Sequence, residues 1–272
     1  MVDVVELLAR PGNERLRFSD VVRELGLTQA TAHAILTTLA DRGWVTRDPT
    51  TKLYSLGPAL AVVAARLIAE RPQVRAATAA AGAISAELGY AASVVERVDD
   101  ELVITAFEGP DGVGAGAPPS DRIPYTPPFG VAFAAWDSPA GQQSWIERGA
   151  VTDPVLAQRL RDLLAQTRER GFDVDWTTPA LTEAARVMGT LPSDGLPPQV
   201  RQIMDQLLAE FTTIGLLGPS GRTQPAATIA APVFDAGQVA LIIGVHPLRP
   251  LSPRRITSIG RRLVALAEPL HV

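Results

Sequence analysis

The sequence contains no cysteine, three histidines and one lysine among its 25 basic residues. Without cysteine there are no disulfides, no thiolate metal sites and no cysteine nucleophile, which is compatible with a reducing cytosol. The histidines lie far apart and lack the spacing of metal ligands. No Gly-x-Ser-x-Gly elbow and no phosphate-binding loop occurs either. We therefore expect a protein that is not an enzyme and that uses no cofactor and no metal.

Long apolar runs are also missing. The longest, Ala59–Ala69, is interrupted by Arg66 and is too short to span a bilayer. The N-terminus lacks the pattern of a signal peptide, so we expect a cytoplasmic protein without a membrane partner. The 272 residues, of which 46% are hydrophobic, suffice for two domains with a core each. The net charge of −4 argues against a general polyanion binder, although residues 1–71 carry nine basic and eight acidic residues.

The most informative stretch is 18–54, FSDVVRELGLTQATAHAILTTLADRGWVTRDPTTKLY. Ser19 is expected to cap a first short helix, which Gly26 ends in a left-handed conformation. Thr28 is expected to cap a second helix, whose apolar residues recur at helical spacing on one face. These residues are Ala32, Ile35, Leu36 and Leu39. Two short strands follow, joined by a turn at 48–51. This order of elements predicts a winged helix-turn-helix.

Four motifs in and after this stretch carry a more specific resemblance. They are Leu25-Gly26-Leu27-Thr28, Ala30-Thr31-Ala32-His33, Leu39-Ala40-Asp41-Arg42-Gly43-Trp44 and Tyr54-Ser55-Leu56-Gly57-Pro58. Together they resemble the N-terminal domain of the IclR family of transcriptional regulators. The resemblance implies a mixed α/β chain with a winged helix-turn-helix at 1–57, a linker helix at 58–71 and a GAF-like α+β effector-binding domain at 72–272. It also implies a sequence-specific regulator that binds double-stranded operator DNA and a small organic effector, as a homodimer or homotetramer.

The recognition helix carries few cations. Its outward face should hold Gln29, Ala30, His33, Ala34 and Thr37. Family members usually have arginine near Ala34 and often near Thr37. Gln29 could read adenine, and the methyl groups of Ala30 and Thr31 could meet thymine. Alternatively, the threonines only cap the helix and His33 is an ordinary surface residue. Arg47 and Lys52 flank the wing turn and are better phosphate candidates. The predicted DNA-binding residues are Thr28, Gln29, Ala30, Thr31, His33, Thr37, Arg47 and Lys52.

The linker helix has an apolar stripe at helical spacing, Leu60, Val63, Ala64, Leu67 and Ile68. Packing within one chain would explain it, but a connector helix has no domain of its own to cover it. We therefore expect the stripe to pack on a partner chain, as linker helices of the family do.

The remaining chain predicts an antiparallel sheet flanked by helices. Helices are expected at 72–88, 139–148, 154–170 and from Pro253, and strands at 91–98, 102–108 and 172–175. The last helix should bury Ile256, Ile259, Leu263 and Val264. The glycine-rich segment 109–122 runs into Pro118-Pro119 and opens no helix, so it is expected to be a loop without a phosphate site. Residues 177–223 form an insertion relative to the family. Its apolar stripe, which suggests core, interface or a lid, is Val200, Ile203, Met204, Leu207, Leu208, Phe211 and Ile214.

The family's effector contacts transfer to Phe129-Gly130, Asp175, Thr228, Gly244 and His246, with Tyr125 nearby. A family cysteine becomes Thr228, two serines become Gly244 and His246, and Val131 replaces the usual lysine. Loss of the serines removes donors suited to a small carboxylate. The expected effector is therefore a larger apolar or aromatic acid, unless no ligand binds. His246 could instead be a core histidine. An alternative function is a small-molecule-binding or protein-interaction module whose winged helix has lost most DNA affinity.

Overall fold

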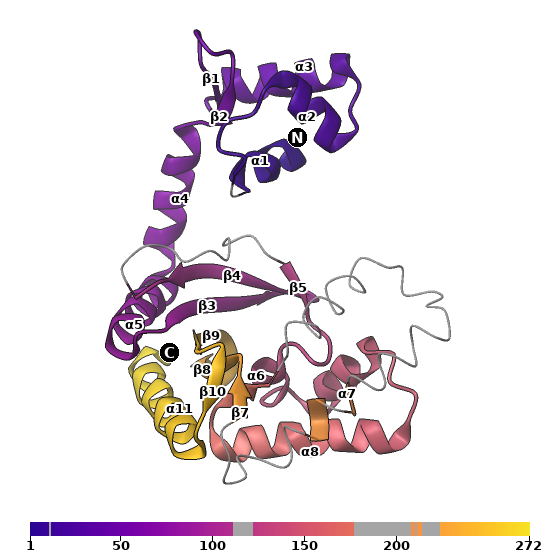
Figure 1. Ribbon diagram of the computed structural model, residues 1–272, viewed down its shortest axis with the longest axis vertical. Coiled ribbons are helices and arrows are strands. Elements are labelled where there is room, and N and C mark those ends of the chain that lie inside the picture. Colours follow the sequence, from indigo (N-terminus) through magenta and orange to yellow (C-terminus); the bar gives the residue numbers. More distant parts are fainter. Residues whose placement is uncertain (11, 111–121, 177–207, 210, 214–223) are drawn as a thin grey trace. The chain divides into compact units, whose positions relative to one another are not determined.

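The computed structural model describes residues 1–10, 12–110, 122–176, 208–209, 211–213 and 224–272. Contacts divide the chain into two compact units, Met1–Arg75 and Ala76–Val272 (Figure 1). Most of the predicted loop at 109–122 and of the predicted insertion lies outside the described residues. So do Val200, Ile203, Met204, Leu207 and Ile214 of the insertion's apolar stripe. Leu208 and Phe211 of that stripe are described, and both are buried. None of the helices in the described part is long and apolar enough to cross a membrane.

The first unit is a winged helix-turn-helix, as predicted. Its elements are α1 (Val2–Ala9), α2 (Phe18–Leu25), α3 (Gln29–Asp41), the hairpin β1 (Val45–Arg47) and β2 (Tyr54–Leu56), and α4 (Ala59–Glu70). One apolar cluster joins α1, α2, α3 and the hairpin, with Leu7, Val21, Leu36, Val45 and Tyr54 among its buried members. Each fully buried aliphatic side chain contributes roughly 1.5–3 kcal/mol of transfer free energy. Gly26 has φ +60°, so it makes the turn between α2 and α3 without the steric cost that other residues incur there.

The expected cap of α2 is wrong. The helix begins at Phe18, and Arg17, not Ser19, occupies the N-cap position. The Asp20 carboxylate reaches back and accepts a hydrogen bond from the Arg17 backbone amide at 3.0 Å. Because Asp20 is the third helical residue, this contact extends the helix back to Phe18 and places Ser19 inside the first turn.

The second unit is built around a six-stranded antiparallel sheet in the order β5-β4-β3-β9-β8-β6. Its strands are β3 (Ala91–Val98), β4 (Glu101–Glu108), β5 (Arg122–Pro124), β6 (Asp173–Asp175), β8 (Thr228–Asp235) and β9 (Gln238–His246). Short strands β7 (Gln224–Ala226) and β10 (Arg249–Leu251) form a separate pair. The helices are α5 (Pro72–Leu88), α6 (Val131–Ala134), α7 (Pro139–Arg148), α8 (Pro154–Arg170), α11 (Pro253–Ala267) and the 3₁₀ turn η1 (Glu268–Leu270).

Helices cover both faces of this sheet (Figure 1). Ala230 and Ile242, on neighbouring strands, pack with residues of α6, α7 and α8 in one buried cluster that includes Trp145. Side chains alternate between the faces of a strand, so Ile229 and Ile243 point to the opposite face. There α11 packs on β8 and β9, and the Arg262 guanidinium at 2.7 Å from Glu87 ties α11 to α5. We call the face covered by α6–α8 the inner face, because the predicted ligand residues lie on it.

One predicted core residue of α11 is wrong. Ile256, Ile259 and Leu263 are buried as expected, but Val264 is 36% exposed. The buried stripe continues instead through Gly260 and Ala267. Consecutive helical residues differ by about 100° in direction, so once Leu263 faces the sheet its neighbour lies at the margin.

Candidate functional site

The recognition helix α3 exposes the residues expected to meet DNA. The predicted residues Gln29, Ala30, Thr31, His33 and Thr37 are all exposed, as is Thr28 in front of the helix. The Thr28 hydroxyl caps α3 by accepting from the Thr31 amide at 3.2 Å, and the two hydroxyls lie 2.8 Å apart. These threonines therefore have a capping role in the free protein, which leaves Gln29 as the longest polar side chain in the first turn of this face.

The wing is a tight hairpin with cations at its base. The Asp48 carboxylate accepts from the Thr50 and Thr51 amides at 2.8 Å each, and these bonds hold the pKa of Asp48 below its usual value. Lys52 has a left-handed backbone, with φ +60°, and its ammonium donates to the Pro49 carbonyl. The Arg47 guanidinium lies 5.6 Å from the ring centre of Tyr54. Arg47 and Lys52 are both exposed, so phosphate could reach them.

Two further arginines lie beside the wing, and the sequence analysis missed them. Leu16 pairs with Tyr54 as a one-residue third strand, with N–H···O distances of 3.0 and 2.8 Å. Leu16 packs on the core, so Arg15 and Arg17 on either side of it point the other way, and both are exposed. The positive charge of Arg15 contributes to the lowered pKa of Asp48 in the wing turn. The alternating pattern Arg-Leu-Arg was the available signal for this strand.

Four predicted ligand residues form a row across the inner face of the second unit. In the sheet register Asp175 is opposite Thr228, and Gly244 is opposite Ala230, so these residues and His246 share one face. The Thr228 hydroxyl lies 3.0 Å from His246 Nδ1. A side chain at Gly244 would begin 3.2 Å from the Thr228 methyl group. Gly244 therefore places no side-chain atoms beside Thr228.

Ser93 completes this row, although no sequence motif pointed to it. It lies opposite Gly244 on β3, is 1% exposed, and its hydroxyl is 2.9 Å from His246 Nε2. The Phe107 ring stacks on the imidazole, with 5.4 Å between ring centres and 19° between ring planes. Burial lowers the pKa of His246 to about 4, so the imidazole is neutral at pH 7. We call Ser93, His246, Thr228 and Asp175 the polar row.

Asp173 is two residues before Asp175 on β6, so both side chains point to the inner face. Desolvation raises the pKa of Asp173 to about 6, while the positive charge of Arg170 and the hydrogen bond from the Val174 amide act in the opposite direction. Desolvation also lowers the pKa of Arg170. The Arg170 guanidinium is held locally, because it donates to the Phe172 carbonyl at 2.9 Å.

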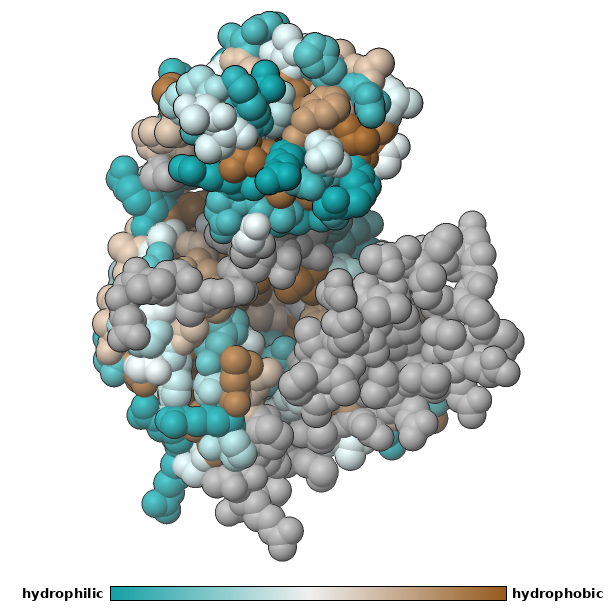
Figure 2. All heavy atoms as spheres, turned by 45° about the horizontal axis from the view of Figure 1, so that its top comes forward, coloured by the Kyte–Doolittle hydropathy of each residue, from teal (hydrophilic) through white to brown (hydrophobic). Residues whose placement is uncertain are grey.

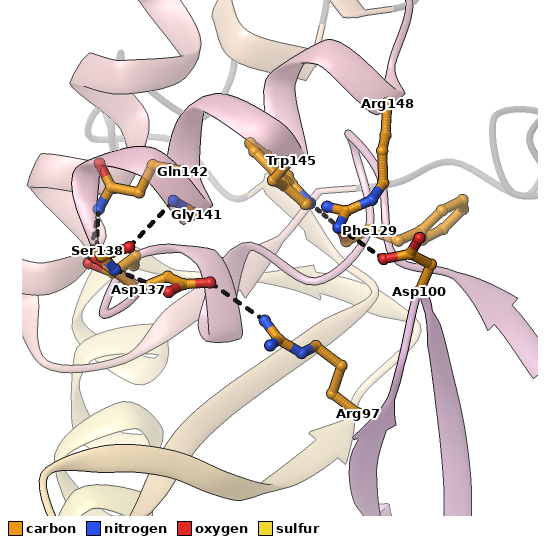
Figure 3. Close-up of polar contacts among 10 residues, drawn as sticks. Arg97, Asp100, Phe129, Asp137, Ser138, Gly141, Gln142, Trp145 and Arg148 are labelled. Atoms are coloured by element: carbon orange, nitrogen blue, oxygen red, sulfur yellow. Dashed lines mark hydrogen bonds and ion pairs between the residues drawn. The ribbon is translucent and has the colours of Figure 1, made fainter.

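The other predicted ligand residues, Tyr125, Phe129 and Gly130, form a second group; Figure 3 shows Phe129 and its polar neighbours. Tyr125 is 1% exposed, and burial raises its pKa. Its ring lies 4.8 Å from the Arg97 guanidinium and 5.4 Å from that of Arg148. A side chain at Gly130 would begin 2.5 Å from this ring, and φ there is +80°, so only glycine fits without displacement.

The two arginines beside Tyr125 each form an ion pair, and Figure 3 shows the arginine and aspartate side chains. Arg97 binds Asp137 at 3.2 Å, and Arg148 binds Asp100 at 2.6 Å. Trp145 Nε1 donates to the Phe129 carbonyl at 2.8 Å. Each arginine is thus matched by an aspartate, so this group offers no uncompensated positive charge to an anion.

The two groups lie on the same face but toward different ends of the strands. Ser93 and Arg97 are four residues apart on β3, which corresponds to roughly 13 Å. Between them α6 packs on β8 and β9, and the cluster there is apolar. Two hollows formed by described residues lie elsewhere. One of about 520 Å³ runs along α11 at Arg254 and Arg261, and one of about 280 Å³ lies in the first unit near Leu25 and Ile35.

Comparison with known proteins agrees with the winged helix-turn-helix seen in the first unit. Residues 1–49 match the family model of the IclR helix-turn-helix domain. No curated protein matches the sequence. Among solved structures, an IclR transcriptional regulator from Alicyclobacillus acidocaldarius is 21% identical, with 100% of this chain and 96% of that chain covered and a TM-score of 0.64.

Two further structures have similar folds. An IclR homologue from Microbacterium hydrocarbonoxydans, complexed with 4-hydroxybenzoate, is 17% identical over 99% of this chain and 96% of that chain, with a TM-score of 0.64. The Thermotoga maritima IclR protein is 14% identical over 99% and 94%, with a TM-score of 0.60. The chain thus begins with an IclR helix-turn-helix domain and has the fold of the IclR-family transcriptional regulators.

Proposed function

We propose that this chain is a cytoplasmic, sequence-specific DNA-binding regulator of transcription that binds a small organic effector in its second unit and acts as a dimer or dimer of dimers. The observation that carries the proposal is the first unit. An IclR helix-turn-helix domain presents the outer face of α3 and, beside it, a wing with exposed cations.

The distribution of charge supports base contacts from α3 and phosphate contacts from other elements. The exposed face of α3 carries Gln29, Ala30, His33 and Thr37 and no cation. Phosphate contacts, which supply most of the affinity, would come from Arg47 and Lys52 of the wing and from Arg15 and Arg17 on the adjoining strand. The face of the first unit seen in Figure 2 mixes hydrophilic residues with scattered apolar ones.

The position of Arg17 at the N-terminus of α2 also favours a contact with phosphate. In helix-turn-helix proteins the first helix of the motif crosses the DNA backbone. Arg17 is the N-cap of that helix, and its amide is already engaged by Asp20, so its side chain is the group left for DNA. Gln29 would then read a base edge, for which adenine is the best partner.

Dimerisation is proposed from α4. Val62, Val63 and Leu67 are 71%, 51% and 52% exposed, although they are large and apolar. Exposed apolar residues grouped on one helix favour burial against another chain. A second copy would also double the number of phosphate contacts, which a weakly basic domain needs.

The test is DNA binding by the full chain to its own upstream region, measured by fluorescence anisotropy over a series of salt concentrations. Arg47→Ala and Lys52→Ala should each lower the salt slope by about one and weaken binding to all sequences alike. Arg17→Ala should do the same. Arg23→Ala is the matched control, because Arg23 is an exposed arginine of α2 that already pairs with Asp20 and Glu24. Absence of salt-dependent binding to every upstream fragment would refute the proposal.

The second candidate is a small-molecule-binding or protein-interaction module that has lost most DNA affinity. The cation-free face of α3 is the observation that favours it. This candidate predicts that Gln29→Ala changes nothing in DNA binding, whereas the regulator proposal predicts relaxed preference at one base pair.

A further inference from the structure

Helix α11 carries four arginines and no acidic residue, and its arginines divide into two pairs. The hydrogen bond from Arg262, and then the positive charges of Arg262 and Arg255, hold the pKa of Glu87 on α5 below its usual value, although desolvation opposes them. Arg254 and Arg261 form no ion pair with any described residue. Consecutive helical residues differ by about 100° in direction, so this second pair points away from α5.

The second pair of arginines borders the hollow of about 520 Å³ along α11. The described residues that line this hollow are Pro253, Arg254, Thr257, Ser258 and Arg261. Residues three, four and seven positions apart share one face of a helix, so these side chains form a continuous stripe. This face lies opposite the one that α11 buries against the sheet. We call Arg254, Thr257, Ser258 and Arg261 the cationic stripe.

All four side chains of the cationic stripe are donors without a hydrogen-bond partner among the described residues. Other helical threonines satisfy themselves locally. The hydroxyls of Thr38 and Thr213 donate to the carbonyl four residues earlier, at 2.8 and 2.6 Å. Thr257 makes no such bond to its own helix, so its hydroxyl and that of Ser258 are available between the two guanidinium groups.

The chemistry of this hollow favours a small anion over a protein partner. Stable protein interfaces use about 20–30 residues on each side and are anchored by large apolar or aromatic side chains. The only apolar residue among the described ones that line the hollow is Pro253. The volume of about 520 Å³ lies within the range of small-ligand sites, ~300–1,000 Å³. Guanidinium groups bind phosphate oxygens through paired, charge-assisted hydrogen bonds.

We infer that the cationic stripe is a binding site for a phosphate chain, either free or as part of a nucleotide. Arg254 and Arg261 are seven residues apart, which is ~10 Å along the helix axis, so a chain of phosphates spans both guanidinium groups. The hydroxyls of Thr257 and Ser258 donate to the oxygens between them. Because α11 covers the face of the sheet opposite the inner face, this site is separate from the proposed effector site.

Calorimetric titration of the full chain in magnesium-free buffer tests the class of ligand. Inorganic tripolyphosphate should bind tightest, pyrophosphate about tenfold more weakly, and phosphate weakest. Citrate, a multivalent anion without phosphate groups, should bind as weakly as phosphate. Equal affinity for citrate and tripolyphosphate, or no binding of tripolyphosphate, would overturn the inference. Adenosine triphosphate that binds as tightly as tripolyphosphate would assign recognition to the chain alone, and tighter binding would identify a nucleotide as the ligand.

Variants assign the binding to the cationic stripe. Arg254→Gln and Arg261→Gln should each weaken tripolyphosphate binding about tenfold, since each removes a charged donor. Arg255→Gln is the matched control, because it removes the same charge from the same helix but lies outside the hollow, and it should change the affinity less than twofold. Equal losses in all three variants would show an effect of overall charge and would overturn the inference. Urea unfolding checks that each variant is folded.

The cations beside the wing are the competing place for a phosphate chain in the full protein. Arg47→Ala separates the two locations. If this variant weakens tripolyphosphate binding and Arg254→Gln does not, the anion binds the surface proposed to contact DNA, and the inference is overturned. If the affinity falls only in the variants of the cationic stripe, the site is on α11.

Discussion

The pH dependence of folding stability follows from two groups on the inner face whose pKa values move in opposite directions. Burial lowers the pKa of His246 from 6.5 to about 4, and desolvation raises the pKa of Asp173 from 3.8 to about 6. Each shift, taken alone, corresponds to ~3 kcal/mol of unfolding free energy, at 1.36 kcal/mol per pH unit. The two titrations cover nearly the same pH range.

Their signs are opposite. Between pH 6.5 and about 4 the unfolded chain protonates His246 and the folded chain does not, so the unfolding free energy falls as pH falls. Between pH 3.8 and about 6 the folded chain keeps the proton of Asp173 and the unfolded chain releases it. The contribution of Asp173 is therefore greatest at low pH and is lost as pH rises. In the wild type the contributions of His246 and Asp173 to the pH dependence of the unfolding free energy nearly cancel.

Asp173→Asn should reveal how His246 alone makes the unfolding free energy depend on pH. The unfolding free energy of this variant should fall by ~3 kcal/mol more than that of the wild type between pH 6.5 and 4. At pH 7 the variant should be the more stable protein, because it no longer buries an ionised carboxylate. The Val174 amide, which donates to Asp173 at 2.8 Å, would then donate to an uncharged acceptor, and this weaker hydrogen bond reduces that gain. His246→Gln should show the opposite slope, and the double variant should follow the wild type.

The assay is urea unfolding at pH values from 4 to 7.5, followed by tryptophan fluorescence. Trp145 and Trp176 are buried in the second unit and report on its unfolding. Other carboxylates titrate in the same range, but they contribute equally to all variants, so the differences between variants are the measured quantity. If the wild type and Asp173→Asn lose stability in parallel from pH 6.5 to 4, the assigned protonation states are refuted.

Three further predictions concern DNA reading, assembly and packing. Gln29→Ala should lose ~1–3 kcal/mol of discrimination at one base pair while leaving the salt slope unchanged, which anisotropy on single-base operator variants would measure. Leu67→Glu should shift sedimentation toward the monomer and weaken DNA binding together, and a variant that stays dimeric would place the interface elsewhere. Gly260→Ala should destabilise the second unit by ~1–3 kcal/mol, because its methyl group would begin 2.4 Å from the Phe172 ring. The matched change Gly82→Ala in α5, where the nearest atom would be 3.9 Å away, should instead stabilise by ~0.5–1 kcal/mol, and urea unfolding compares the two.

Most of the secondary structure could be predicted from the sequence because its signals are local. Ser138 and Asp153 cap α7 and α8, proline follows each cap, and Gly171 ends α8 with φ +84°; the predicted ranges 139–148 and 154–170 match the structure. Strand β3 also has its predicted range, and the winged helix-turn-helix follows from Gly26, Thr28 and the wing turn. A hydrogen bond to a neighbouring amide, or a left-handed residue, depends on a few consecutive positions. Such features can be read before the chain is folded.

The candidate sites could be predicted only in part. Sequence reasoning named Thr228 and His246, but it did not find Ser93, which is 153 residues from His246 in the chain and 2.9 Å from it in the fold. It likewise missed Arg15 and Arg17, because the pairing of Leu16 with Tyr54 is non-local. The seven predicted ligand residues share the inner face but fall into two groups, a division that the strand register sets.

The sequence by itself determined where most of the helices and the longer strands begin and end, since capping, turn formation and hydrophobic periodicity act over a few residues. Only the tertiary structure decided which polar groups meet. Sheet register joined Ser93, His246 and Thr228, and burial then lowered the pKa of the imidazole. Packing placed Tyr125 near two arginines, each matched by an aspartate. Desolvation and hydrogen-bond partnership depend on distances between segments that are remote in the chain, so no local pattern specifies them.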